Sequence, residues 1–210
     1  MPNSNPELTR LVLGPLQTNC YLVVCPNSRA AVVIDPADQV DEILKAAQQK
    51  TARIEQILLT HMHPDHVAAL PALREATGAK VLAHRLEVDL LNSSGRFFGI
   101  QPEQLPSLLP DVLLEGGETV NIGNLNGTII HTPGHTPGCI CLQLGHILFT
   151  GDTLFCQGIG RVDLPGGNLD NILASLRKLF TLPDETAVYP GHGPSTTIGA
   201  EKRDNPYVKF

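Results

Sequence analysis

Residues 60–66 read T-H-M-H-P-D-H and follow an apolar run at 57–59, so three imidazoles and one carboxylate crowd into one turn. In an extended backbone, side chains two positions apart point the same way, so His61 and His63 can grip one metal ion. Asp65 and His66 follow where the chain must turn, and they face a different point in space. A single histidine is usually structural, but four ligand-type residues at this spacing predict a metal site.

Two pairs of ligands do not fill two coordination shells, so further ligands must come from elsewhere in the chain. Three other stretches place a histidine or aspartate beside glycine after an apolar run: residues 131–138 (HTPGHTPG), 150–153 (TGDT) and 189–194 (YPGHGP). Each stretch alone has a structural explanation, because Asp and His are frequent in turns. Together with residues 60–66 they form a set, and polar residues on rigid turns at strand ends are where sites are built.

Apolar patterning predicts more strands than helices. Strands are expected over residues 11–13, 20–24, 31–34, 54–59, 80–83, 112–114, 126–130, 140–144, 147–149 and 187–189. Helices are expected over 40–47 with Asp38 as a cap, from Pro71 to Gly78, over 85–91 and over 172–180. This mixture predicts an α+β fold with sheets packed face to face and helices outside. Residues 93–110 lack periodicity and hold several Gly and Pro residues, so they form a candidate lid or substrate flap.

A chain of 210 residues that is 42% hydrophobic can bury a real core, and no composition break divides it, so residues 1–210 are predicted to form a single domain. No apolar stretch is long enough to span a bilayer, and residues 1–8 lack the apolar region of a secretory signal. The five cysteines, an odd number, are then expected to be reduced thiols in a cytoplasmic protein. A net charge of −6 argues against nucleic acid as a partner.

The ligand clusters follow one another in an order that resembles the metallo-β-lactamase superfamily of hydrolases, and within it the glyoxalase II-like group (hydroxyacylglutathione hydrolases). The likeness covers nearly the whole chain, because residues 18–21 (TNCY), 34–36 (IDP) and 205–206 (NP) also fit that group. It implies the metallo-β-lactamase fold, a four-layered αβ/βα sandwich with the metals at one edge of the sheets. The H-x-H-x-D-H motif is specific for the superfamily and not for any one reaction.

The resemblance further implies two metal ions with seven ligands in two groups. These are His61, His63 and His135 on the first metal, Asp65, His66 and His192 on the second, and Asp152 bridging both. Asp35 and His131 match positions near the site and are expected to support the ligands. His84 and His146 match no ligand motif and are expected to be structural or surface residues.

Two such cations, about 3.5 Å apart, share one hydroxide at neutral pH, because metal binding lowers the pKa of water to about 7. The hydroxide attacks an ester-like carbonyl, a metal polarises the carbonyl oxygen, and a thiolate leaves easily. Asp65 is also a candidate catalytic residue that orients the hydroxide or accepts its proton. Mixed His/Asp ligation suits zinc, although iron or manganese can occupy similar sites. The implied substrate is a small-molecule thioester such as S-D-lactoylglutathione.

The turn after Asp152 carries Arg161, and glyoxalase II-like proteins have a comparable Gly-Arg turn beside the substrate. Arg161 is therefore a candidate substrate-binding residue for a carboxylate of an acidic thiol such as glutathione. An ion pair with Asp163 explains Arg161 equally well, and Cys156 is expected to pack. Full-length glyoxalase II carries much of its glutathione site on a C-terminal helical domain, whereas this sequence, like the shorter members, ends about 18 residues after His192.

Two other functions stay open. The persulfide dioxygenases are a related family that keeps these motifs and uses a single iron, for which His61, His135 and Asp152 would be the ligands. A catalytically inactive metal-binding module on the same fold would have eroded ligands, whereas all seven are present here.

Overall fold

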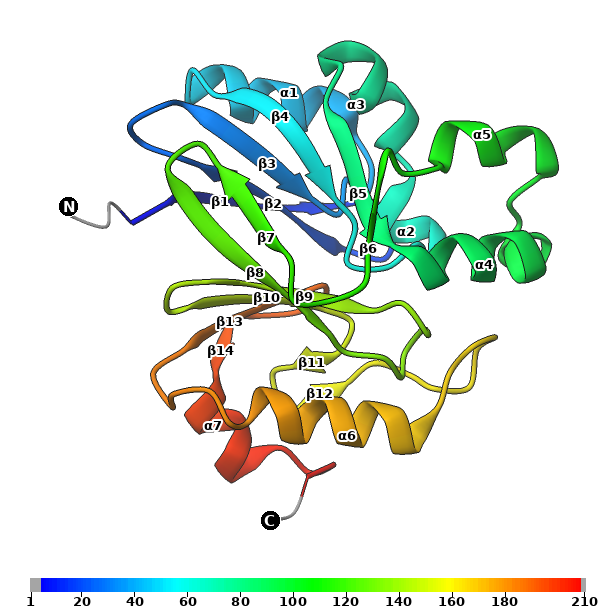
Figure 1. Ribbon diagram of the computed structural model, residues 1–210, viewed down its shortest axis with the longest axis vertical. Helices are drawn as coiled ribbons and strands as arrows, with labels where there is room; N and C mark the ends of the chain where they lie inside the picture. Colours follow the sequence, from blue (N-terminus) through cyan, green and yellow to red (C-terminus); the bar gives the residue numbers. More distant parts are fainter. Residues whose placement is uncertain (1–4, 209–210) are drawn as a thin grey trace.

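Two six-stranded sheets face each other and carry helices on their outer sides in the computed structural model, which describes residues 5–208 (Figure 1). Residues 1–4, part of the segment searched for a secretory signal, lie outside the described residues. No helix between residues 5 and 208 is long and apolar enough to cross a membrane.

The first sheet combines an antiparallel half with a parallel half. Its strands, in spatial order, are β1 (Glu7–Leu13), β2 (Thr18–Val24), β3 (Ala30–Ile34), β4 (Arg53–Leu58), β5 (Lys80–His84) and β6 (Val112–Leu114). Strands β1 to β3 pair antiparallel, and β3 to β6 pair parallel. Every residue of β2 and β3 is buried, as expected for continuous apolar runs that are covered on both faces of a sheet.

The second sheet has the spatial order β14-β13-β10-β9-β8-β7. Its strands are β7 (Thr119–Ile122), β8 (Leu125–His131), β9 (Ile140–Leu144), β10 (Ile147–Gly151), β13 (Ala187–Pro190) and β14 (Thr196–Thr197). Neighbours pair antiparallel except β10 and β13, which are parallel. A short ribbon of β11 (Leu154–Phe155) and β12 (Gly158–Ile159) follows β10.

Helices complete four layers, so the predicted α+β class and sandwich arrangement are confirmed (Figure 1). They are α1 (Val40–Gln49), α2 (Pro64–Val67), α3 (Leu70–Thr77) and α4 (Arg85–Ser94) beside the first sheet, and α6 (Leu169–Leu179) and α7 (Ile198–Asp204) beside the second. Three apolar clusters fill the spaces between layers. Ile43 packs with Ile57 under α1, Ile34 with Phe149 between the sheets, and Leu176 lies in the cluster under α6.

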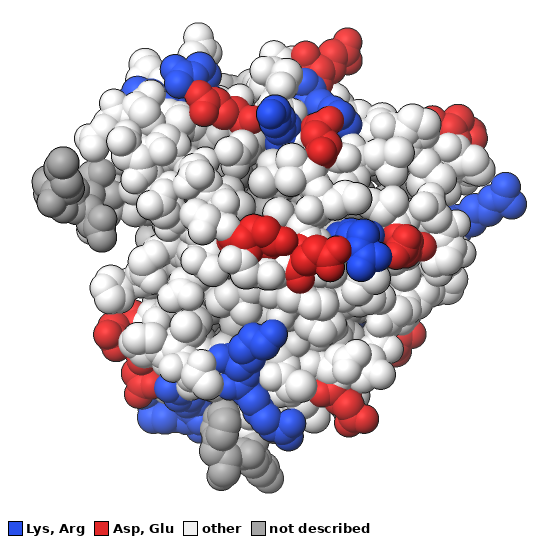
Figure 2. Space-filling model, viewed as in Figure 1, with Lys and Arg blue, Asp and Glu red and all other residues white. Residues whose placement is uncertain are grey.

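Charged side chains of both signs are interspersed on the face shown in Figure 2, with a basic group over α6 and α7. The last turns of these helices hold Arg177, Lys178, Lys202 and Arg203. Helix C-termini carry partial negative charge, so basic residues are stabilising there.

Several segments differ from the prediction, among them residues 93–110 and the start of α1. Residues 93–110 are not an open loop, because α4 extends to Ser94 and is followed by the 3-10 turns η1 (Gly95–Phe98) and η2 (Pro102–Gln104) and by helix α5 (Leu105–Leu108). Turns this short give no helical periodicity in the sequence. Asp38 does not cap α1: Gln39 occupies the N-cap position with φ 49° and no side-chain cap, and Asp38 accepts a hydrogen bond from the Gln39 N–H.

Candidate metal centre

A carboxylate from the neighbouring strand holds the H-x-H turn. Asp35 follows β3 and lies beside Thr60, which follows β4, because these strands are parallel neighbours. Its Oδ1 accepts a hydrogen bond from the Thr60 N–H at 2.7 Å, and its Oδ2 accepts one from the Thr60 hydroxyl at 2.6 Å. Oδ2 also lies 2.9 Å from His66 Nδ1. Asp35 therefore has the expected supporting role, and it orients His66 so that Nε2 faces the centre.

His61, His63 and His135 come together as the resemblance implied. Each offers a ring nitrogen within 4.8 Å of the other two, and His63 Nδ1 lies 2.8 Å from His135 Nε2. Nδ1 of His135 lies 2.7 Å from the backbone carbonyl of Arg161. Because a carbonyl only accepts, Nδ1 carries the proton and Nε2 presents its lone pair to the centre.

Asp65, His66 and His192 form a second group, again with ligand-type atoms within 4.8 Å of one another. His192 Nε2 lies 3.3 Å from Asp65 Oδ2. The hydroxyl of Thr18, at the start of β2, donates to the same oxygen at 2.9 Å. The Asp65 carboxylate is therefore held in place by Thr18 and His192, which lie outside the turn of residues 60–66.

Asp152 lies between the two groups. Its Oδ1 is 3.4 Å from His66 Nε2, and its Oδ2 is 3.6 Å from both His135 Nε2 and His192 Nε2. A Cβ on Gly191 would lie 2.2 Å from Asp152 Oδ1, so only glycine lets these two turns approach so closely. The position of Asp152 matches that of a carboxylate shared by two metal sites.

Strand β2 anchors the turn that carries His192. The Asn19 amide donates to the carbonyls of Pro190 at 2.8 Å and Gly193 at 2.9 Å. The Tyr21 hydroxyl donates to the Pro190 carbonyl at 2.7 Å. The conformation of the His192 turn therefore depends on residues 18–21, which the sequence singled out only through the resemblance.

Glu87 is a site residue that sequence reasoning missed. It lies in α4, is fully buried, and accepts hydrogen bonds from the Met62 N–H at 2.8 Å, the Thr136 hydroxyl at 2.6 Å and the Gly138 N–H at 2.9 Å. Burial raises the pKa of Glu87, and these three bonds oppose the rise. A charged residue in register with the apolar Leu90 and Leu91 was the available signal.

Several other residues lie beside the ligands. His131 Nε2 is 2.9 Å from the Pro137 carbonyl and supports the turn of His135, and its ring stacks on His84 with centroids 4.1 Å apart. Arg161 directs Nε and Nη2 to the Asp163 carboxylate at 2.8 and 2.7 Å, and both side chains are exposed. The expectation that Cys156 packs is wrong, because the β11–β12 turn holds it at the surface.

The imidazoles of the first group are neutral at neutral pH. Burial, reinforced by neighbouring imidazoles, lowers the pKa of His61 well below its ordinary value. Burial and His135 lower the pKa of His63 to about 3, and burial lowers the pKa of His135 as well. Neutral imidazole is the form that binds a metal.

The carboxylates of Asp65 and Asp152 are ionised, and they favour positive charge between them. Burial alone would raise the pKa of Asp152, but His66 lowers it. Burial likewise opposes ionisation of Asp65, but the hydrogen bonds from His192 and Thr18 and the charge of His66 together lower its pKa. Burial lowers the pKa of His66, yet the charges of Asp152 and Asp35 raise it well above its ordinary value.

Four buried polar atoms of the centre have no hydrogen-bond partner within residues 5–208. They are His61 Nε2, His63 Nε2, His66 Nε2 and Asp152 Oδ1. Buried polar atoms are rarely left unpaired in proteins, so such a cluster calls for a ligand. Imidazole nitrogens and carboxylate oxygens together are donors for divalent transition metals. The residues present therefore fit a metal centre.

Comparison with known proteins agrees with this chemistry. Residues 13–192 match the model of the metallo-beta-lactamase superfamily. The hydroxyacylglutathione hydrolase GloC of Haemophilus influenzae is 34% identical over 91% of this chain and 93% of its own length. The solved structure of TTHA1623 in a di-iron-bound form is 38% identical with a TM-score of 0.82, covering 95% of this chain and 100% of that one. ETHE1 from Myxococcus xanthus is 35% identical with a TM-score of 0.80, covering 95% and 83%.

Proposed function

The chain belongs to the metallo-beta-lactamase superfamily, and from that premise we propose that it is a dinuclear metal-dependent hydrolase of thioesters such as S-D-lactoylglutathione. The place of Asp152 carries the proposal, because its carboxylate lies 3.4–3.6 Å from histidines of both groups. Seven ligands with one shared carboxylate suit two metal shells. Zinc is the proposed metal, and iron or manganese is the alternative for such a donor set. The relatives are consistent with this assignment, since one is a hydroxyacylglutathione hydrolase and another binds two irons.

The seven residues would hold two divalent cations, which when bound would supply a hydroxide nucleophile at neutral pH and polarise the substrate carbonyl. The protein's own residues hold the reacting groups. Asp65 is proposed to orient the nucleophile and to accept its proton at Oδ2, the oxygen that the Thr18 hydroxyl fixes. Asp35 and Glu87 keep the ligand turns in register while the carbonyl carbon changes geometry.

Arg161 is proposed to bind a carboxylate of the thiol. Its guanidinium is exposed and paired with Asp163, so a substrate carboxylate can replace Asp163 with little change in free energy. The backbone carbonyl of Arg161 accepts a hydrogen bond from His135. This contact keeps the Gly-Arg turn beside the metal centre, where the thiol half of the substrate leaves.

A second candidate function is oxidation of a persulfide at a single iron. The ligands it needs also lie together: the rings of His61 and His135 have centroids 4.8 Å apart, and His135 Nε2 is 3.6 Å from Asp152 Oδ2. The likeness to ETHE1 favours this reading over the remaining alternatives.

Metal content and activity measured on one sample of purified protein separate the two functions. The proposal expects close to two equivalents of zinc, iron or manganese and turnover of S-D-lactoylglutathione. One equivalent of iron, with oxygen consumption on glutathione persulfide, would establish the dioxygenase instead. If esters or lactones are hydrolysed but no glutathione thioester is, the substrate assignment is wrong, whereas the hydrolytic function is supported.

A further inference from the structure

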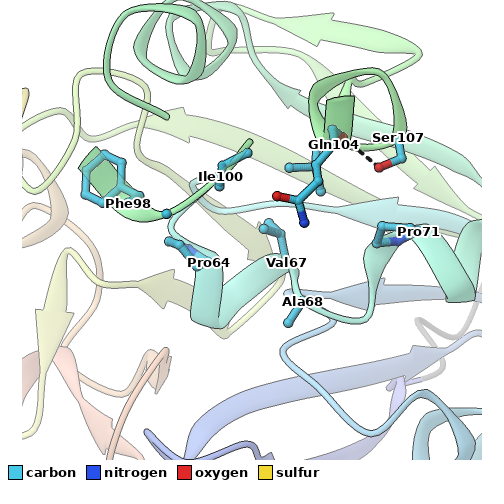
Figure 3. Close-up of a pocket in the computed structure, with 10 residues that line it drawn as sticks. Pro64, Val67, Ala68, Pro71, Phe98, Ile100, Gln104 and Ser107 are labelled. Atoms are coloured by element: carbon cyan, nitrogen blue, oxygen red, sulfur yellow. Dashed lines mark hydrogen bonds between the residues drawn. The ribbon is translucent and has the colours of Figure 1, made fainter. Parts of the chain in front are cut away.

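We infer that an apolar cavity beside His63 binds the acyl group of the substrate, so that thioesters with an extended apolar acyl chain are the preferred substrate class. The inference rests on the proposed hydrolase function and names the substrate of the same site. The cavity has a volume of about 280 Å³ and lies between α2 and residues 98–108 (Figure 3). Pro64, Val67, Phe98, Ile100 and Leu108 supply most of its apolar wall.

Two lining residues, Pro64 and Phe98, join the cavity to the metal centre, although no ligand residue lines it. Pro64 directly follows His63, and the Phe98 ring packs on the His63 ring with centroids 4.7 Å apart. In Figure 3, Pro64 and Phe98 lie at one end of the cavity, and Pro71 and Ser107 lie at the other. A carbonyl held beside His63 therefore has space for its substituent in the direction of Pro71.

The lining suits an uncharged group. None of the ten lining residues is charged, and the polar ones are Gln104 and Ser107. The Ser107 hydroxyl already donates to the Gln104 backbone carbonyl at 2.7 Å. Apart from the exposed Gln104 and Ser107, the lining offers no polar side chain, so an ionised carboxylate would exchange much of its hydration for apolar surface. The cavity therefore suits the acyl half of a glutathione thioester better than the thiol half, which carries carboxylates.

The centre also has a cavity with polar lining residues. A second cavity of about 410 Å³ lies beside His192, and Arg10, Gln17 and Asn19 are among its lining residues. The metal centre thus has an apolar cavity on its His63 side and a polar cavity on its His192 side. The cavity beside His63 is thus the one that suits an apolar acyl group, while Arg161 remains the residue proposed for a carboxylate of the thiol.

A chain-length series tests the inference. Acetyl, butanoyl and hexanoyl thioesters of glutathione are compared by kcat/KM with the metal-loaded protein. Burial of one methylene contributes about 0.8 kcal/mol, which corresponds to about a fourfold gain in kcat/KM. We expect kcat/KM to rise along the series by up to about this factor for each methylene.

A cavity-filling variant tests the location. Ala68 lines the cavity and is exposed, so Ala68→Leu should lower the ratio of hexanoyl to acetyl kcat/KM by about tenfold. Ala76 is an equally exposed alanine of α3 that does not line the cavity. The control Ala76→Leu should retain the wild-type ratio. A ratio that is the same in all three proteins would overturn the inference while thioester hydrolysis stands.

Ligand binding without turnover separates this inference from the proposed function. Hexanamide, an uncharged mimic of the acyl half, should shift the methyl NMR signals of Val67, Ile100 and Leu108, whereas acetamide should not. If hexanamide causes such shifts but no thioester is hydrolysed, the apolar subsite is supported and the hydrolase function is contradicted. Hexanamide that leaves these methyl signals unshifted would show that the cavity does not bind acyl groups.

Discussion

The carboxylate of Glu87 accepts a hydrogen bond at 2.8 Å from the backbone N–H of Met62, the residue between the two histidines of the H-x-H motif. Its other oxygen accepts hydrogen bonds from the turn that carries His135. One buried carboxylate therefore couples two ligand turns that come from different sheets. This coupling makes Glu87 a positioning residue for the metal centre.

Glu87→Gln should weaken metal binding. The amide NH₂ would face the Met62 N–H, so two donors would meet where a donor and an acceptor met before. Loss of such supporting contacts typically lowers metal affinity 10- to 100-fold, and the unpaired donor costs about 1–3 kcal/mol of stability. Zinc affinity measured by chelator competition checks the first effect. Glu75→Gln, at an exposed position of α3, is the control and should bind zinc as the wild type does.

Asp152→Ala should lower activity more than Arg161→Ala. Removal of Asp152 takes a ligand from both metal groups, whereas Arg161 acts through an exposed ion pair with Asp163. We expect kcat/KM on S-D-lactoylglutathione to fall by more than about 100-fold for Asp152→Ala, and KM to carry most of the effect of Arg161→Ala. The reverse order of activities would show that these two roles are assigned wrongly.

Asp35→Asn should reduce metal affinity without unfolding the chain. Asp35 has φ 51°, a left-handed conformation that Asn tolerates. The amide retains one acceptor oxygen for Thr60 but loses the charge that faces His66 Nδ1. Metal content after dialysis should fall toward one equivalent, with the second group depleted first. Two retained equivalents would mean that the Asp35 charge is not needed there.

Metal-free protein should lose stability as the pH falls from 7 to 5. Burial lowers the pKa of His61, His63 and His135 below the ordinary value of 6.5, so the unfolded state binds protons first in this range. His63, with a pKa of about 3, alone accounts for about 2 kcal/mol at pH 5. Thermal unfolding of chelator-treated protein at pH 5, 6 and 7 measures this loss.

In the second group, the raised pKa of His66 affects stability in the opposite direction and mainly at higher pH. The pKa of His66 is raised, because the charges of Asp152 and Asp35 outweigh the effect of burial. Its stabilising contribution is fully present below pH 6.5 and is lost as the pH rises through the folded-state pKa. Between pH 7 and pH 5 it therefore offsets only part of the loss that the three imidazoles of the first group cause. A melting temperature that stays level or rises between pH 7 and pH 5 would contradict the proposed neutral state of the first group.

The candidate ligand residues were predictable because they stand in short local patterns: His61, His63, Asp65 and His66 in the H-x-H-x-D-H turn, and the other three each beside a glycine at a strand end. The main strands and helices were predictable from apolar periodicity within residues 5–208. Glu87 was not, since its partners Met62, Thr136 and Gly138 come from other segments and only the tertiary fold brings them to α4. In the sequence, such a residue shows only as one charged residue on an otherwise apolar helix face.

Short elements were missed for a different reason. Strands β11, β12 and β14 have two residues each, too few to display an alternating pattern. Helix α7 offered a local signal, because the Thr197 hydroxyl accepts a hydrogen bond from the Ala200 N–H as an N-cap does. The cavity beside His63 could not be predicted for the same reason, since η1, η2 and α5, which form part of its wall, are too short to give a sequence pattern.

The hydrogen bond from Asn19 to the Pro190 carbonyl joins residues 171 positions apart, and it sets the order of events during synthesis. His192 meets its support in β2 only after the more than 170 residues between them have been synthesised. Contacts this distant in sequence form slowly, because loop closure must precede them. A nascent chain can therefore expose the H-x-H-x-D-H turn well before His192 is in place, and a metal centre that needs His192 would be completed only after that contact forms.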